Sequence, residues 1–179
     1  MFTFFELNFS PHLFPQLRNI NPLRLEFELF TEAAPSITSQ FISLCRGVKL
    51  NGRFTSYRNC SFWRIVPGYM AFSGDIERNN GSGHVTLDSE KFLQYEDSGK
   101  THDARGLLTT NNQTRSTVDS QFIITLKPCE WLDDRHTVFG RVTAETESNL
   151  VWLDKAGALA TPLPLDAVTI VNCGIVNHR

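Results

Sequence analysis

The segment of residues 23–29 constrains the fold more than any other part of the sequence. Leu23, Leu25, Phe27 and Leu29 alternate there with charged residues. A period of two places the apolar side chains on one face of a strand and the charges on the other. A sheet with one buried face and one wet face is typical of antiparallel pairing. The chain is therefore predicted to be built on an antiparallel sheet.

Two helices are predicted to interrupt the strands. Thr31 is the expected N-cap of the first helix, Pro35 suits its first turn, and Gly47 suits its C-terminal cap. The second helix is predicted over 144–156, with Gly157 at its end. This order predicts a mainly β barrel with helices at its ends. A loop is predicted at 10–21, and strands at 2–9, 61–66, 69–72, 106–109, 121–126, 137–142 and 168–173.

Length and composition place the chain among ordinary globular proteins. The 179 residues, 1–179, suit a single domain, and 14 phenylalanines favour an aromatic core. The net charge of −2 indicates no nucleic-acid partner, and no apolar run approaches the roughly 18 residues of a membrane span. The N-terminus lacks the basic region of a signal peptide, so the cytoplasm is the expected compartment. The chain is also expected to be a monomer.

The cysteines and histidines give no sign of a metal or cofactor site. Their spacing does not match a set of metal ligands. Free, buried thiols are expected at the cysteines, namely Cys45, Cys60, Cys129 and Cys173. Four of the five histidines are expected on the surface, namely His12, His84, His102 and His178.

Three longer motifs carry a resemblance to a known family. FWRIVPGYM at 62–70 resembles the cyclophilin motif FHRIIPGFM, and SQFIIT at 120–125 is similar to SQFFI. EWLDDRHTVFGRV at 130–142 is similar to the family's WLDxxHxVFGxV. The resemblance extends over about residues 2–176. It implies a closed eight-stranded antiparallel β-barrel capped by two helices, with a peptide groove on the outside of the barrel.

The resemblance also implies an activity, the cis/trans isomerisation of X-Pro bonds in protein substrates. This reaction breaks no covalent bond, so it needs a pocket for the proline ring and a donor for the prolyl nitrogen rather than a nucleophile or a metal. By motif, the catalytic residues are Arg64, Phe122 and Gln121. The substrate-binding residues by motif are Tyr69, Met70, Phe72, Asn111, Asn112, Gln113, Ile123, Trp131, Leu132 and His136.

Some of these residues have plainer readings without their motifs. Arg64 would be a solvated surface cation, and Tyr69 and Phe122 would be ordinary core residues. Trp131 could plug an end of the barrel, and His136 could be a structural histidine. Two functions from different classes stay open: an active isomerase, and a proline-peptide binding module with weak catalysis.

The sequence departs from the family pattern around the groove. Phe72 stands where the family usually has Gln, Trp63 replaces His, and Ile123 replaces Phe. Cyclosporin, a cyclic peptide that family members commonly bind, is expected to bind less tightly because Asn111 and Gln113 replace small residues. A second pocket, for a side chain upstream of the proline, is expected to prefer basic residues. Its rim is predicted at Ser82, Glu90, Lys91, Asn111, Gln113, Thr117 and Asp119.

Overall fold

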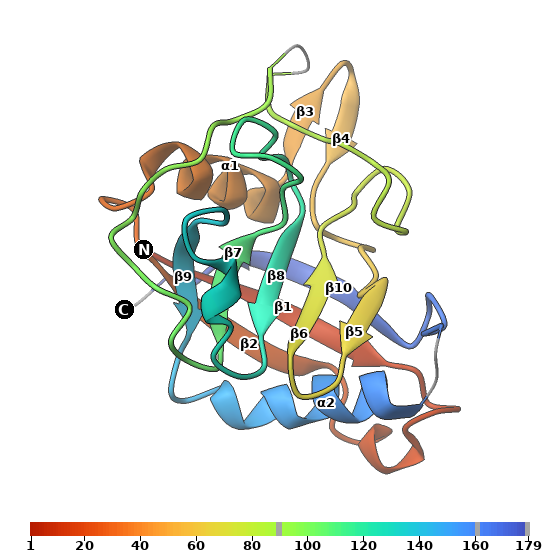
Figure 1. The fold of residues 1–179 in the computed structure, drawn as a ribbon. Coiled ribbons are helices and arrows are strands. Elements are labelled where there is room, and N and C mark those ends of the chain that lie inside the picture. Colours follow the sequence, from red (N-terminus) through yellow and green to blue (C-terminus); the bar gives the residue numbers. More distant parts are fainter. Residues whose placement is uncertain (89–90, 160–161, 178–179) are drawn as a thin grey trace.

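A computed structural model describes residues 1–88, 91–159 and 162–177. Within this part of the chain, eight strands form one antiparallel sheet in the order β10-β1-β2-β9-β7-β8-β6-β5, and the sheet curls into a barrel-like shape (Figure 1). The strands are β1 (Phe2–Phe9), β2 (Leu23–Leu29), β5 (Arg64–Val66), β6 (Met70–Ser73), β7 (Leu107–Thr110), β8 (Phe122–Thr125), β9 (Val138–Val142) and β10 (Val168–Ile175).

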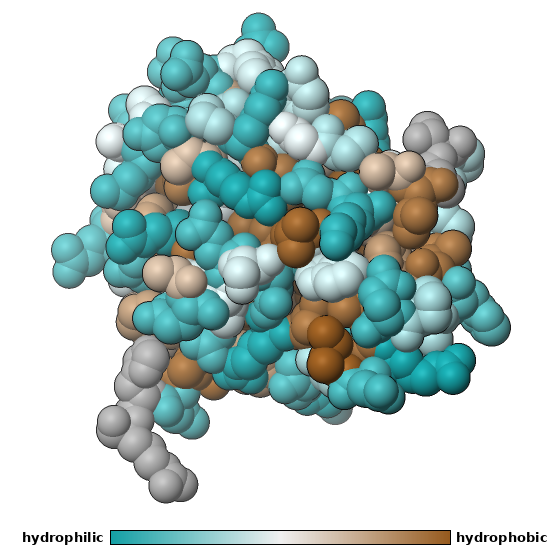
Figure 2. Space-filling view, turned by 90° about the horizontal axis from the view of Figure 1, so that it is seen from below, coloured by the Kyte–Doolittle hydropathy of each residue, from teal (hydrophilic) through white to brown (hydrophobic). Residues whose placement is uncertain are grey.

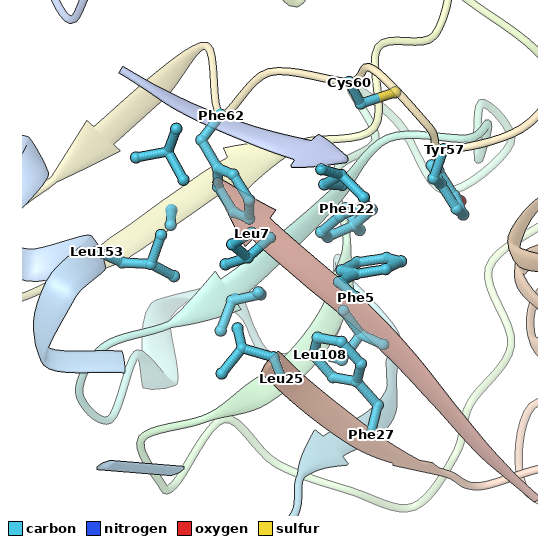
Figure 3. Close-up of a cluster of buried hydrophobic side chains, with 14 of the residues drawn as sticks. Phe5, Leu7, Leu25, Phe27, Tyr57, Cys60, Phe62, Leu108, Phe122 and Leu153 are labelled. Carbon is cyan, nitrogen blue, oxygen red and sulfur yellow. The ribbon is translucent and has the colours of Figure 1, made fainter. Parts of the chain in front are cut away.

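The alternation that predicted the sheet is confirmed in β1 and β2. Along both strands buried residues alternate with half-buried ones, and the two strands pair in register from Phe2 opposite Glu28 to Leu7 opposite Leu23. The buried side chains meet inside the curled sheet, where aromatic rings pack against one another (Figure 3). Phe5, for example, contacts Phe27 with ring centroids 5.0 Å apart. The expected aromatic core is therefore present.

The prediction of a closed barrel needs a correction. The two edge strands of the sheet, β10 and β5, do not pair as strands. The segment before β5 spans the seam, with an isolated bridge between Ser61 and Thr169 and a hydrogen bond from the Phe62 N–H to the Val168 carbonyl. The sheet is a half-barrel that a short irregular segment covers, because the chain turns away from β10 before it enters β5.

Helix α1 (Pro35–Arg46) covers one end of the half-barrel (Figure 1). Pro35 lies in its first turn and Gly47 follows its last residue, as predicted. Thr31 is not the N-cap, since the helix begins four residues later and Ala34 occupies that position. The free backbone N–H groups of Ser36 and Ile37 instead donate to the Glu96 carboxylate at 3.0 Å. A cap from so distant a residue could not be read from the local sequence.

Helix α2 (Leu150–Leu159) covers the other end and starts later than predicted, after the short helix η3 (Glu147–Asn149). Gly157 lies inside this helix rather than at its end. A Cβ at Gly157 would come within 2.7 Å of the Ile65 Cγ2 atom on β5. The glycine therefore marks the close packing of α2 against the sheet, not a helix stop.

The remaining elements lie outside the main sheet. A hairpin of β3 (Val48–Leu50) and β4 (Arg53–Thr55), which no sequence pattern indicated, follows α1. Two short helices, η1 (Pro15–Leu17) and η2 (Glu130–Leu132), interrupt longer connections. Apolar side chains on the face that carries α2 lie at several separate places among hydrophilic ones (Figure 2). None of the described helices is long and apolar enough to cross a bilayer.

Candidate functional site

A row of side chains crosses the outer face of the sheet. Arg64 on β5 pairs with Phe72 on β6, Phe72 pairs with Ile123 on β8, and Ile123 pairs with Thr109 on β7. Residues opposite one another in neighbouring strands point to the same face. The sheet therefore places the arginine and two apolar side chains of the predicted site in one line, outside the barrel.

An apolar cluster lies at the centre of this row. Met70, Ile123, Cys129 and Leu132 pack together, with Phe72 against them, separately from the main core. Burial raises the pKa of the Cys129 thiol, which keeps the sulfur neutral. The cluster joins β6 and β8 to the segment around η2. It is the only described apolar cluster on this outer face and corresponds to the predicted proline pocket.

The structure places Phe122, which was predicted as catalytic, inside the barrel rather than on the outer row. Its ring points into the barrel, where its centroid lies 5.5 Å from that of Phe5 and 5.4 Å from that of Tyr57 (Figure 3). Successive residues of a strand face opposite ways, so Ile123 rather than Phe122 reaches the groove. Phe122 belongs to the core, which corrects its assignment to the site.

The aromatic rim of the groove comes from Tyr69 and Trp131. Their ring centroids lie 5.9 Å apart, and the Lys127 ammonium is 3.5 Å from the Tyr69 ring centroid and 5.6 Å from that of Trp131. Trp131 is 56% exposed, so it does not plug the barrel. An exposed indole and phenol beside an apolar pocket offer flat contact surface and hydrogen-bonding groups to a peptide.

Arg64 is supported by aromatic rings instead of an amide. Its guanidinium carbon lies 5.5 Å from the Phe72 ring centroid, and the Trp63 ring centroid lies 5.3 Å from that of Phe72. Arg64 itself is exposed, and no described carboxylate forms an ion pair with it. Its N–H groups are thus not committed to a carboxylate. The cation–π contact holds the side chain without directing its donors.

Asn112 and His136 join the segments that border the groove. The Asn112 amide donates to the carbonyls of Thr114 and Arg135, at 2.6 and 3.1 Å. The His136 Nδ1 lies 2.9 Å from the Thr110 carbonyl, which fixes the proton on Nδ1 because a carbonyl only accepts. Burial lowers the pKa of His136, so its neutral form is favoured. Both side chains are therefore tied to backbone carbonyls of neighbouring segments.

Gln121 and Asp75 hold the loop at 78–83 against the sheet. The Gln121 amide donates to the carbonyls of Gly81 and Gly83, and its oxygen accepts from Asn111. The Asp75 carboxylate accepts four backbone N–H groups, from residues 78, 80, 81 and 83. Burial alone would raise the pKa of Asp75, but these donors lower it below its ordinary value. Gln121, predicted as catalytic, is buried, and its side-chain amide is bonded to this loop and to Asn111.

Gly81 shows how closely this loop approaches the Arg64 support. Its φ of +87° is unfavourable for other residues, and a Cβ there would lie 2.7 Å from the Trp63 ring. The indole Nε1 of Trp63 is buried and has no hydrogen-bond partner among the described residues. The loop, Trp63 and Phe72 thus form one packed layer behind Arg64.

A pocket of about 260 Å³, called the second pocket below, contains residues of the predicted site, among them Asn111 and Gln121. Asn111, Gln113, Thr117 and Asp119 line it, as predicted for the upstream pocket. Of the other predicted rim residues, Ser82 and Lys91 are exposed nearby in the chain, and Glu90 lies outside the described residues. The remaining lining residues are Gly81, His84, Phe92, Asn112 and Gln121.

One histidine was misjudged from the sequence, and a second has a partner that the sequence did not indicate. His102 was expected on the surface but is fully buried, with Nδ1 2.6 Å from Asp133 and Nε2 2.8 Å from Thr109 on the outer row. His84 is exposed as expected, but its Nδ1 donates to Asp119 at 2.8 Å in the second pocket. Asp119 lies 35 residues away in the chain, so no local signal pairs the two. His12 is exposed, and His178 lies outside the described residues.

The comparisons with known proteins agree with this geometry. Residues 18–175 match the family described as cyclophilin type peptidyl-prolyl cis-trans isomerase/CLD. The chain is 34% identical over 152 residues to the Arabidopsis thaliana protein named peptidyl-prolyl cis-trans isomerase CYP22. The aligned residues make up 84% of this chain and 76% of the relative. Together with the half-barrel and its two helices, these matches show that the chain belongs to the cyclophilin-type peptidyl-prolyl cis-trans isomerase family.

Proposed function

We propose that this cyclophilin-type isomerase turns X-Pro bonds in the groove along the outer row, with Arg64 as the donor to the prolyl nitrogen. The observation that carries the proposal is the cross-strand line of Arg64, Phe72 and Ile123, which sets an arginine with no ion pair to a described carboxylate beside an apolar cluster. Proline-containing protein segments are the substrates. Assistance to folding or conformational switching is the expected role.

Isomerisation of an X-Pro bond requires only that the protein stabilise the twisted state of the amide. Rotation about the X-Pro bond is opposed by amide resonance, and the prolyl nitrogen gains a lone pair only in the twisted state. A donor beside that nitrogen therefore stabilises the twisted state more than either planar isomer. The apolar cluster of Met70, Ile123 and Leu132 holds the proline ring while the chain upstream of it rotates.

The required acceleration is modest. Uncatalysed X-Pro exchange takes tens to hundreds of seconds, so a turnover of about 10 s⁻¹ needs roughly 10³-fold acceleration, or about 4 kcal/mol. One charge-assisted hydrogen bond and a fixed proline ring are of that order. A nucleophile or proton transfer is not part of the scheme, so His136 in its neutral form is compatible with it.

Replacing Arg64 tests the proposal directly. Arg64→Ala is expected to lower kcat/KM for X-Pro exchange by roughly 10²-fold, about 3 kcal/mol, because it removes a contact made mainly in the twisted state. Exchange is measured on a proline peptide by NMR. Arg141→Ala, which removes an exposed arginine on β9 that pairs with Glu28 on β2, is the matched control and should retain wild-type activity. Near-full activity of Arg64→Ala would exclude this mechanism.

A proline-peptide binding module is the second candidate. It is favoured by the support of Arg64, since the Phe72 ring cannot accept a hydrogen bond that would aim the guanidinium. Binding without catalysis would appear as peptide chemical-shift changes without faster exchange. The same NMR experiment separates the two functions.

Further properties belong to the same proposal. The second pocket takes a side chain upstream of the proline and prefers a basic one, which the Asp119 carboxylate in its wall supports. Cyclosporin binds along the groove, supported by the exposed indole of Trp131. The protein works in the cytoplasm as a monomer, which its four free, buried cysteines support for the compartment.

A further inference from the structure

The second pocket contains a hydrogen-bonded pair of ionisable side chains. His84 and Asp119 are the two ionisable residues among the described residues that line it, and the other polar ones are neutral amides and a threonine. The His84 Nδ1 lies 2.8 Å from the Asp119 Oδ2. The charge of the pocket is therefore set by this pair.

The two members of the pair differ in their access to a ligand. The Asp119 side chain is 2% exposed, and its other oxygen accepts the Gln121 backbone N–H at 2.8 Å. The His84 side chain is 43% exposed. Asp119 thus cannot reach an incoming side chain directly, whereas the imidazole can. The acid acts on the ligand through the histidine and through its field.

The histidine is held in place on several sides. Its ring meets Phe92 edge to face, with centroids 5.8 Å apart. The residues before it are anchored by Gln121 at the carbonyls of Gly81 and Gly83. Its backbone N–H donates to Glu77 at 3.4 Å. An imidazole fixed in this way presents one defined nitrogen, Nε2, away from Asp119.

The state of Nε2 decides what the pocket recognises. Because Asp119 accepts the Nδ1 proton, neutral His84 carries a lone pair on Nε2, and the pair has one net negative charge. After protonation, Nε2–H becomes a donor and the pair is neutral overall. The first state attracts a basic side chain, and the second accepts a carboxylate or another hydrogen-bond acceptor.

We propose that His84, oriented by Asp119, is the specificity-determining residue of the second pocket, selecting Lys or Arg upstream of the proline when neutral and losing that selection when protonated. The inference rests on the proposed function, because it concerns the choice among substrates of the same groove. It keeps the preference for a basic side chain that the sequence predicts and assigns the control of that preference to the His84–Asp119 pair.

Other charged groups around the histidine do not change over the range to be tested. Glu77, which accepts the His84 backbone N–H, and Asp75 precede the loop at 78–83. Lys91 is next to Phe92 in the chain. Between pH 5.5 and 8.5, ordinary carboxylates stay ionised and lysines stay protonated. Burial raises the pKa of Asp119, and the hydrogen bonds from His84 and Gln121 oppose that rise.

The experiment compares three peptides that differ only at the position in the second pocket, which carries Lys, Gln or Glu. The ratio of kcat/KM for Lys to that for Glu is measured from pH 5.5 to 8.5 at low salt. If the neutral imidazole makes the choice, the ratio in the wild type should be several-fold higher at pH 8.5 than at pH 5.5. Taking a ratio cancels any effect that His136 has on all substrates alike.

Two variants give opposite expectations. His84→Gln removes the titration and keeps the acid, so the ratio should be high and independent of pH. Asp119→Asn keeps the shape and the titrating ring but removes the negative charge, so the ratio should be lower throughout and still rise with pH. His12→Gln, at an exposed histidine in the 10–21 loop, is the control and should follow the wild type.

The outcomes separate this inference from the function on which it rests. If none of the peptides is turned over, the proposed function fails. If all are turned over but the ratio is flat in the wild type, or if His84→Gln keeps the wild-type slope, His84 does not set the choice. Folding of each variant is checked by circular dichroism and thermal unfolding before the kinetics are compared.

Discussion

Phe122 and Ile123 are neighbours on β8, yet they serve the two opposite faces of the sheet. Phe122 packs among the rings of the large interior cluster, and Ile123 packs in the small outer cluster beside Arg64. Both are nearly fully buried, at 1% exposure each. Burial alone thus does not separate a residue that stabilises the fold from one that shapes the groove. The face of the strand does.

The contrast explains how the groove can depart from the family pattern while the fold stays the same. Trp63, Phe72 and Ile123 lie on or behind the outer row. The interior rings contact one another instead and do not depend on these positions. Changes on the outer face can therefore alter activity with little effect on the core.

The largest expected effect is a loss of stability from a substitution on the inner face of β8. Phe122→Ala should lower the free energy of unfolding by about 3–5 kcal/mol, because a large ring is removed from a packed core. Ile123→Ala should cost about 2 kcal/mol, the low end for such a change, since its cluster is small and borders solvent. Denaturant unfolding of both variants measures the difference. Equal losses of stability would show that the two clusters form one cooperative core.

Activity should depend more on Ile123 than on Phe122, which is the reverse of the order expected for stability. Under conditions where both variants are folded, Ile123→Ala should raise KM for a proline peptide several-fold, and Phe122→Ala should stay close to wild type. A larger loss of activity in folded Phe122→Ala would restore the catalytic role that the motif suggested for it.

A smaller effect is expected from the support of Arg64. Phe72→Gln should raise kcat/KM several-fold, because a carboxamide can accept a hydrogen bond from the guanidinium and direct it. The cation–π contact that is lost contributes about 0.5–1 kcal/mol at an exposed site. Phe72→Leu, which removes the ring without adding an acceptor, is the control. A drop in activity for Phe72→Gln would mean that the stack with Trp63 is the better support.

The smallest expected effect concerns cyclosporin at the edge of the second pocket. The double variant Asn111→Ala/Gln113→Ala should bind the cyclic peptide a few-fold more tightly, because smaller side chains widen the entrance. Asn111 also donates to Gln121, so part of the gain is offset by the lost hydrogen bond. Calorimetric titration compares the two proteins. Tighter binding by the wild type would contradict the crowding argument.

Much of the fold followed from local pattern. Alternation of period two located β2, and the helix signals at Pro35 and Gly47 were sufficient for α1. The motifs also brought Arg64, Met70, Ile123 and Leu132 to one surface, as the register confirms. These features depend on residues that are close in the chain or already in a known pattern.

The rest depended on distant partners. The cap of α1 comes from Glu96, the tight packing of Gly157 comes from Ile65, and the pairing of His84 needs Asp119. The direction of Phe122 depends on strand register, which shifts by a full face with one residue. The hairpin of β3 and β4 was missed because each strand has only three residues, with Phe54 70% exposed.

The position of β1 also has a consequence for how the chain is made. β1 lies between β2 and β10, and its pairs join Thr3 to Ile175 and Phe9 to Val168. During synthesis, β1 and β2 can meet early, but the far edge of β1 stays open until residues 168–175 have left the ribosome. Contacts of such long sequence separation slow folding and leave a strand edge exposed in the nascent chain. Chaperones that bind extended apolar segments should therefore act on this protein chiefly at its first strand.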